Sequence, residues 1–261
     1  MIHLKTADEI ELMARGGAII GGLLGELETR VVPGVSTGDL DSFADSYIRD
    51  HDGAVPAFKG LYGFPGSVCV SLNEEVVHGI PSPARILEDG DIVSVDVGVK
   101  LDGWCSDSAW TFEVGQVDDE TRRLLDVTRL SLDRAIEAVR PGGRVGDIGA
   151  AVVATVDGTG FGIIRDLVGH GVGREVHEDP QVPNVGRAGF GPLLRVGMVL
   201  AIEPMLSAGS EMIRTLSDRW TVVTADAARA AHFEHTVAVT EGGSRILTAP
   251  CLETRSRAVY N

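Results

Sequence analysis

The pattern of hydrophobic and polar residues follows a helical period near the start of the chain. Between residues 6 and 28, apolar residues recur at intervals of three and four, and Thr6 and Glu9 have the spacing of a capping box. Pro33-Gly34 interrupts this pattern, and a second amphipathic helix is predicted from Asp39 to Asp50. The chain therefore opens with a pair of helices.

A second pair of helices is predicted further along. Apolar residues again recur with the helical period from Asp118 to Arg140, and a shorter run extends from Asp147 to Val156. Strand-like segments at 54–58 and 67–72 lie between the two pairs. The chain from Gly162 onward is predicted to form strands joined by loops rich in glycine and proline.

The stretch from Asp91 to Asp107 has the alternating period of a strand. Three valines at alternate positions point to one side, and Asp96 points to the other. The Asp-Gly pair within residues 100–103 predicts a hairpin turn, and Asp107 is predicted at the head of a strand from Ala109 to Val114. Because burying an unpaired carboxylate is costly, two acids in one hairpin favour a metal site.

Parts of this pattern occur twice. The motif P-G-x-x-x-G-D opens the second predicted helix at Pro33 and the fourth at Pro141. The motif L-x-x-G-x-x-x-x, followed by an aliphatic residue and an acid, ends at Asp96 in the first half and at Glu203 in the second. Matches in the same order and with nearly the same separation favour a duplicated helix–helix–strand unit.

The duplication predicts where the acids lie. Asp107 corresponds to Glu234 in the same way, so each half contributes two carboxylates. If the halves face each other across a pseudo-twofold axis, the four acids converge at the centre. We predict one α+β domain over residues 1–261, with repeat units of roughly 6–117 and 118–248.

Composition and charge narrow the class of protein. The 261 residues are 44% hydrophobic and 23% charged, as in ordinary soluble proteins. A net charge of −15 argues against a surface that binds nucleic acid. Three scattered cysteines fit a reducing compartment, and neither a signal peptide nor an apolar run of about 18 residues is found. We expect a cytoplasmic protein without membrane or nucleic-acid partners.

Four converging carboxylates predict bound cations. Their mutual repulsion in a low dielectric would raise several pKa values, and two divalent ions would neutralise them. Carboxylates combined with one or two histidines suit Mn, Fe, Co or Zn, and paired metals are a recurring hydrolytic device. His170, which has a glycine on each side, and His177 are the candidate histidine ligands.

These residues also have ordinary structural interpretations. Each acid, taken singly, could form a salt bridge, cap a turn or pair with a local histidine. His170 could be a core histidine, and His78 and His177 could be exposed loop residues. The repeat favours the metal site for the acids, whereas the remaining histidines are interpreted as structural or solvated: His3, His51, His232 and His235.

The chain resembles the methionine aminopeptidases of peptidase family M24, in particular their short bacterial type I form. Five residues match the metal ligands of that family in order and surroundings: Asp96, Asp107, His170, Glu203 and Glu234. The resemblance extends from the first helix to about Thr248, and its most specific segments are Ser67–Glu74, Val77–Pro81, Gly169–Gly173 and Ala201–Pro204. It implies the pita-bread fold, in which two pseudo-twofold-related halves surround a central antiparallel sheet.

The resemblance also implies a metal arrangement. Asp107 and Glu234 would bridge two divalent ions (Co, Mn, Fe or Zn), Asp96 would bind one ion, and His170 with Glu203 would bind the other. A metal-bridging hydroxide would attack the carbonyl after the first residue of the substrate.

The remaining roles follow from the same resemblance. Glu203 would receive the proton of the nucleophile, His177 would stabilise the oxyanion, and His78 would contact the amide on the leaving side. The activity implied is that of a metallo-exopeptidase, a hydrolase that removes the initiator methionine from nascent proteins and prefers a small second residue. Its partners would be the N-termini of nascent polypeptides near the ribosome exit, and we expect a monomer.

The side-chain pocket is where the chain departs from the family pattern. His78 and His177 would also contact the substrate, and the pocket wall would consist of Phe58, Leu61, Phe64, Cys69, Val176 and Trp220. Type I members commonly have cysteine at the first of these positions, tyrosine at the second and third, and phenylalanine at the fifth. The lining remains apolar, which suits a thioether.

Two other functions compete with this one. An Xaa-Pro aminopeptidase or prolidase has the same fold, but such enzymes usually carry an extra N-terminal domain, for which we expect no room before the first helix. A non-catalytic binding module would have lost metal ligands, whereas all five matching residues are present here.

Overall fold

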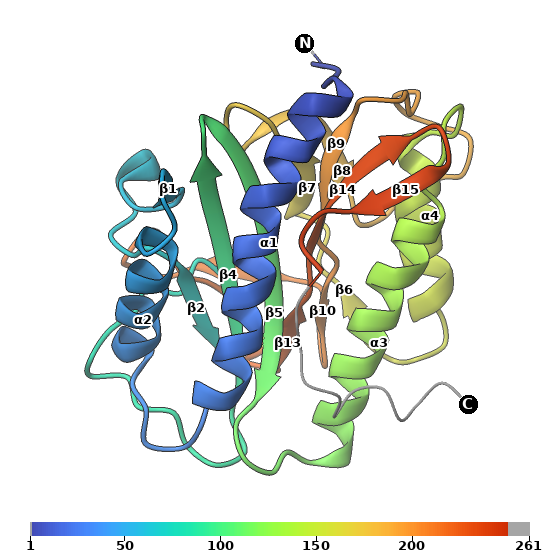
Figure 1. Ribbon diagram of the computed structural model, residues 1–261. Helices are drawn as coiled ribbons and strands as arrows, with labels where there is room; N and C mark the ends of the chain where they lie inside the picture. The colour runs from blue at the N-terminus through green and yellow to red at the C-terminus, as the bar shows by residue number, and fades with distance from the viewer. Residues whose placement is uncertain (1, 250–261) are drawn as a thin grey trace.

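The computed structural model describes residues 2–249, which contain four α-helices (Figure 1). The helices are α1 (Ala7–Arg30), α2 (Thr37–Arg49), α3 (Asp119–Glu137) and α4 (Val145–Val156), with a short 3-10 helix at Leu61–Gly63. All four predicted helices are thus confirmed. None of the helices described is long and apolar enough to cross a membrane.

Short and long strands make up most of the rest. In chain order they are β1 (Ala54–Pro56), β2 (Cys69–Leu72), β3 (Glu75–Val77), β4 (Ile92–Leu101), β5 (Trp104–Glu113), β6 (Gly162–Ile163), β7 (Val168–Gly171), β8 (Glu178–Pro183), β9 (Val199–Ile202), β10 (Met205–Ser207), β11 (Ile213–Thr215), β12 (Val222–Thr224), β13 (Ala230–His232), β14 (His235–Thr240) and β15 (Gly243–Ile246).

Helix starts are set by local side-chain caps. At α1 the predicted capping box is present: the Glu9 N–H donates to Thr6 Oγ1, and the Thr6 N–H donates to Glu9 Oε2. The predicted start of the second helix at Asp39 was wrong by two residues, because Asp39 is the third residue of the helix and accepts the Ser36 N–H at 3.0 Å. Asp147 has the same role at α4, which begins at Val145.

Strands β4 and β5 form the predicted hairpin. They pair without interruption from Ile92 opposite Glu113 to Leu101 opposite Trp104. Asp102 and Gly103, both at positive φ, make the two-residue turn that the Asp-Gly pair predicts. The prediction that Asp107 heads its strand was wrong. Because pairing starts directly after the turn, Asp107 lies inside β5, opposite Gly98.

The strands form four antiparallel sheets. One has the order β1-β4-β2 with β5 on β4, and another has the order β15-β14-β9-β7-β8; the two smaller sheets are β13-β10-β6 and β11-β12-β3. The two large sheets meet at β5 and β14, where the Glu234 N–H donates to Ala109 O at 2.9 Å and Thr236 Oγ1 accepts the Asp107 N–H at 2.9 Å. The predicted central sheet therefore consists of two sheets joined along this seam.

Each helix pair covers its own core. In Figure 1, α2 and α4 lie on opposite sides of the molecule, with β4, β5, β9 and β14 between them. The valines of β4 that alternate with Asp96 are fully buried in the core beneath α1 and α2. A separate core lies beneath α3 and α4. The other face of β4 is left to form the wall of a cavity between the two large sheets.

Candidate active site

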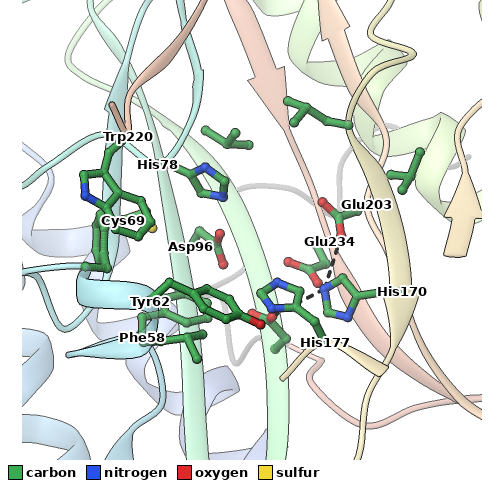
Figure 2. Close-up of a pocket in the computed structure, with 16 residues that line it drawn as sticks. Phe58, Tyr62, Cys69, His78, Asp96, His170, His177, Glu203, Trp220 and Glu234 are labelled. Carbon is green, nitrogen blue, oxygen red and sulfur yellow. Dashed lines mark ion pairs between the residues drawn. The ribbon is translucent and has the colours of Figure 1, made fainter. Parts of the chain in front are cut away.

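Four acidic side chains reach this cavity from paired strands (Figure 2). Asp96 belongs to β4 and Asp107 to its neighbour β5. Glu203 directly follows β9, and Glu234 directly precedes β14, which pairs with β9. Each large sheet thus contributes two carboxylates, as the sequence predicted from the repeated motifs.

His170 completes the group from β7, the strand beside β9. Its Nδ1 lies 2.9 Å from Gly171 O, which fixes the proton on Nδ1 and leaves Nε2 as an acceptor. Nε2 lies 3.5 Å from Glu203 Oε1 and 3.9 Å from Asp107 Oδ2. One ligand atom each from Asp107, His170 and Glu234 lie within 4.8 Å of one another.

Burial dominates the electrostatics of the group. Burial, with repulsion between the acids, raises the pKa of Asp107 and of Glu234 well above the usual range, and burial beside Asp96 does the same to the pKa of Glu203. Burial also raises the pKa of Asp96 to about 7 and lowers the pKa of His170 to about 4. Either protons or a bound cation would therefore relieve the cost of burying these acids together.

Several oxygens of this group are unsatisfied. Asp96 Oδ1, Asp107 Oδ1 and Glu234 Oε1 are buried and have no hydrogen-bond partner among residues 2–249. Leaving a buried acceptor unpaired costs about 1–3 kcal/mol, and more for a charged group. Carboxylate oxygens combined with an imidazole nitrogen are suitable donors for divalent transition metals. The residues present therefore fit a divalent metal centre.

Two further histidines face the cavity from opposite sides, as Figure 2 shows. The His177 ring lies edge-on to the His170 ring, with centroids 4.5 Å apart. His78, held at φ 60°, lies edge-on to Trp220. Burial lowers the pKa of both side chains. Both rings are thus neutral at physiological pH and can each donate one hydrogen bond.

The cavity has a volume of about 240 Å³. Of the predicted pocket wall, five residues line it: Phe58, Leu61, Phe64, Cys69 and Trp220. Val176 does not. Its side chain is buried in the apolar cluster that includes Phe58 and Phe64, because a short branched side chain at this position packs into the wall and does not extend beyond it.

Some residues at the site were not predicted from the sequence. Tyr62 lies at the cavity with its ring stacked on His177, at 6.0 Å between centroids, and its backbone is left-handed. His232 was interpreted as structural or solvated, yet its Nε2 is buried 3.7 Å from Glu203 Oε2. The alternation of a strand could have indicated His232, which precedes Glu234 by two residues. No sequence signal marks Tyr62.

Val77, Leu167 and Val168 also line the cavity and were not predicted. All three are apolar, and they extend the apolar wall that the sequence indicated. Their positions depend on how β3 and the segment before β7 approach the site, which involves pairing between distant parts of the chain.

Comparison with known proteins shows which family this chain matches. A model of metallopeptidase family M24 matches residues 11–241. Methionine aminopeptidase 1 of Bacillus subtilis is 50% identical over 248 residues, which cover 95% of this chain and 99% of the relative. Methionine aminopeptidase 1 of Mycobacterium tuberculosis is 47% identical, with 95% of each chain covered.

Solved structures were also found to resemble this chain. A methionine aminopeptidase from Thermotoga maritima superimposes with a TM-score of 0.93 at 47% identity, covering 95% of this chain and 99% of that one. A prolidase from Pyrococcus furiosus superimposes with a TM-score of 0.75 at 23% identity, and this chain covers 65% of its length. The second likeness concerns the fold alone.

Proposed function

Because this chain belongs to metallopeptidase family M24, we propose that it is a methionine aminopeptidase, a metal-dependent hydrolase that removes the N-terminal methionine of polypeptides. The predicted family resemblance and the α+β pita-bread fold are confirmed. The observation that carries the proposal is the buried cluster of Asp107, His170 and Glu234 beside an apolar cavity.

Five side chains would hold two divalent ions: Asp96, Asp107, His170, Glu203 and Glu234. The unpaired oxygens of three of these acids support this assignment. When bound, such ions polarise a substrate carbonyl and make a coordinated water more acidic. Co, Mn, Fe and Zn all suit this mixed donor set.

The protein's own groups would move the protons. Glu203, which faces the cavity, would accept a proton from the attacking water and pass it to the leaving amine. His177, as a neutral donor, would stabilise the oxyanion on the carbonyl. His78, on the opposite side of the cavity, would donate to the amide on the leaving side.

The apolar end of the cavity would hold the methionine side chain. The Phe64 and Trp220 rings pack edge-to-face at 5.1 Å, and the Cys69 thiol lies in the same wall. A thioether is polarisable and packs well against such groups. The free α-amine of the substrate would lie near Asp96, which restricts cleavage to N-termini. We propose nascent proteins with a small second residue as substrates, and a monomeric enzyme acting in the cytoplasm.

We also propose that the chain is one catalytic domain built from two related units, 6–117 and 118–248. Equivalent positions make equivalent backbone bridges, Ser36 with Ile86 in the first unit and Arg144 with Leu193 in the second.

Hydrolysis of Met-Ala-Ser tests the proposed function. Protein stripped with a chelator is expected to release free methionine only after Co(II), Mn(II) or Fe(II) is added. Turnover of an Ala-Pro peptide but not of Met-Ala-Ser would favour the prolidase alternative. No release with any metal, from protein shown to be folded, would favour a binding module. Neither alternative is favoured by the comparisons.

A further inference from the structure

A buried ion pair lies outside the group of acids. Lys5 Nζ donates to Glu178 Oε2 at 2.8 Å, and the two side chains are only 3% and 12% exposed. The pair links the segment before α1 to the first residue of β8. Removing one partner of a buried pair leaves an uncompensated charge, so such a pair constrains both segments strongly.

Glu178 organises the loop between β7 and β8. Its other oxygen, Oε1, accepts the N–H of Arg174 at 2.8 Å and the N–H of Glu175 at 3.3 Å. The carboxylate also fills the space that a Cβ on Gly173 would need, so the loop closes around it. His177 lies in the same loop and directly precedes Glu178.

Lys5 is held as firmly as its partner. Its N–H donates to Gly197 O at 2.7 Å, and the next residue, Thr6, caps α1. Burial alone would raise the pKa of Glu178, but the hydrogen bond from Lys5 and the two backbone N–H groups outweigh it and lower that pKa. The carboxylate is therefore ionised at neutral pH.

We propose that the Lys5–Glu178 pair positions His177, by fixing the backbone of the loop that directs this ring into the cavity. The inference rests on the proposed function, in which His177 stabilises the oxyanion. Lys5 touches neither substrate nor reacting atoms, so it is a positioning residue that acts through Glu178.

Kinetics of metal-loaded variants on Met-Ala-Ser test the proposal. Lys5→Met keeps the length of the side chain and removes its charge, and it is expected to lower kcat roughly tenfold with little change in KM. Lys5→Arg is expected to restore most of kcat. The matched control is Arg15→Met, which breaks an exposed ion pair between α1 and Asp102 in the turn between β4 and β5, and which is expected to leave kcat unchanged.

A double-mutant cycle identifies the residue through which Lys5 acts. In a His177→Ala background, Lys5→Met is expected to cause no further loss of kcat, because the ring that it positions is already gone. An equal loss in both backgrounds, or a loss of thermal stability with normal kcat, would overturn the proposal.

Hydrogen exchange separates this inference from the proposed function. If wild-type protein releases no methionine, the proposed function fails, and exchange at the Arg174 and Glu175 amides decides the inference. Both amides are expected to exchange faster in Lys5→Met than in wild type or Arg15→Met, because their acceptor loses its partner. Unchanged exchange would show that Lys5 does not hold the loop.

Discussion

At the scale of single residues, burial makes the acids of the site depend on one another. Asp107 and Glu234 are 3% and 2% exposed, and each has an oxygen without a partner among the residues described. Their backbones are fixed at the seam between β5 and β14, where Ser108 Oγ also donates to Glu234 O. Because the backbones cannot move apart, the repulsion between the carboxylates can be relieved only by protons or by a cation.

Asp107→Asn tests this dependence. The amide keeps the shape of the side chain but is a neutral, weaker ligand, so we expect metal affinity to fall and kcat to drop more than the roughly 10–100-fold typical of groups that only support a metal ligand. Calorimetric metal titration and Met-Ala-Ser hydrolysis measure the two effects, and circular dichroism checks the fold.

The control for this variant lies in the same hairpin. Asp102 is half-exposed in the turn at a left-handed φ that asparagine tolerates, so Asp102→Asn should keep both metal affinity and kcat. Near-normal kcat in Asp107→Asn would show that its assignment as a ligand is wrong.

At the scale of elements, β4 supports the pocket as well as the acids. Residues 54–56 pair with β4 as strand β1, and the contact continues at the next residue, where the Ala57 N–H donates to Gly98 O at 2.8 Å. Gly98 leaves room for the Phe58 ring, which lies directly against the strand. The size of the cavity thus depends on a glycine that does not line it.

Gly98→Ala should narrow the cavity. An added Cβ would lie 2.5 Å from Phe58 Cε1 and 3.0 Å from Ala57 Cβ, so the ring must move. We expect KM for Met-Ala-Ser to rise with a smaller change in kcat, and stability to fall by about 1–3 kcal/mol from overpacking. Gly16→Ala in α1 is the control, because its nearest atom, Ser106 Oγ, would be 3.4 Å away. Unchanged KM in Gly98→Ala would contradict this role.

The capping box of α2 gives a separate test of stability. Ser36 Oγ accepts the Asp39 N–H at 3.0 Å and contacts Asp39 Oδ2 at 2.7 Å. Ser36→Ala should therefore lower the free energy of unfolding by about 1 kcal/mol, without a change in kcat. Urea denaturation measures the loss. Ser42→Ala, on the exposed face of the same helix, should stay within about 0.5 kcal/mol of wild type, and equal losses in the two variants would refute the cap.

At the scale of the whole molecule, local features were predictable and long-range ones were not. The capping box of α1, the helical periods and the Asp102-Gly103 turn are each specified within a few residues, so the sequence indicated them. The repeated motifs also made the convergence of the four acids predictable, although these residues are distant in the chain. The seam between β5 and β14 and the position of Val176 in the wall depend on how distant segments pack together, which no local pattern contains.

The pH dependence of stability is a property of the whole molecule, because it depends on the titratable groups that folding buries. Burial raises the pKa of each of the four acids, to about 7 for Asp96. The folded, metal-free protein therefore binds protons more tightly than the unfolded chain, so its stability falls as pH rises through the folded values. Burial lowers the pKa of His170 from 6.5 to about 4, so this side chain makes stability rise with pH between these two values. Above pH 6.5 it no longer contributes to the pH dependence.

The expected result is a loss of thermal stability above pH 6.5 that metal prevents. Between pH 6.5 and about pH 8.5, Tm of chelator-treated protein should fall by several degrees, since about 1 kcal/mol corresponds to roughly 2–4 °C in a protein of this size. With Mn(II) bound, the acids stay ionised throughout and Tm should change little. Asp96→Asn removes one of the titrating groups and should reduce the loss in the metal-free protein. A metal-free Tm that does not change with pH would show that the acids are not held in the buried, mutually repelling arrangement described above.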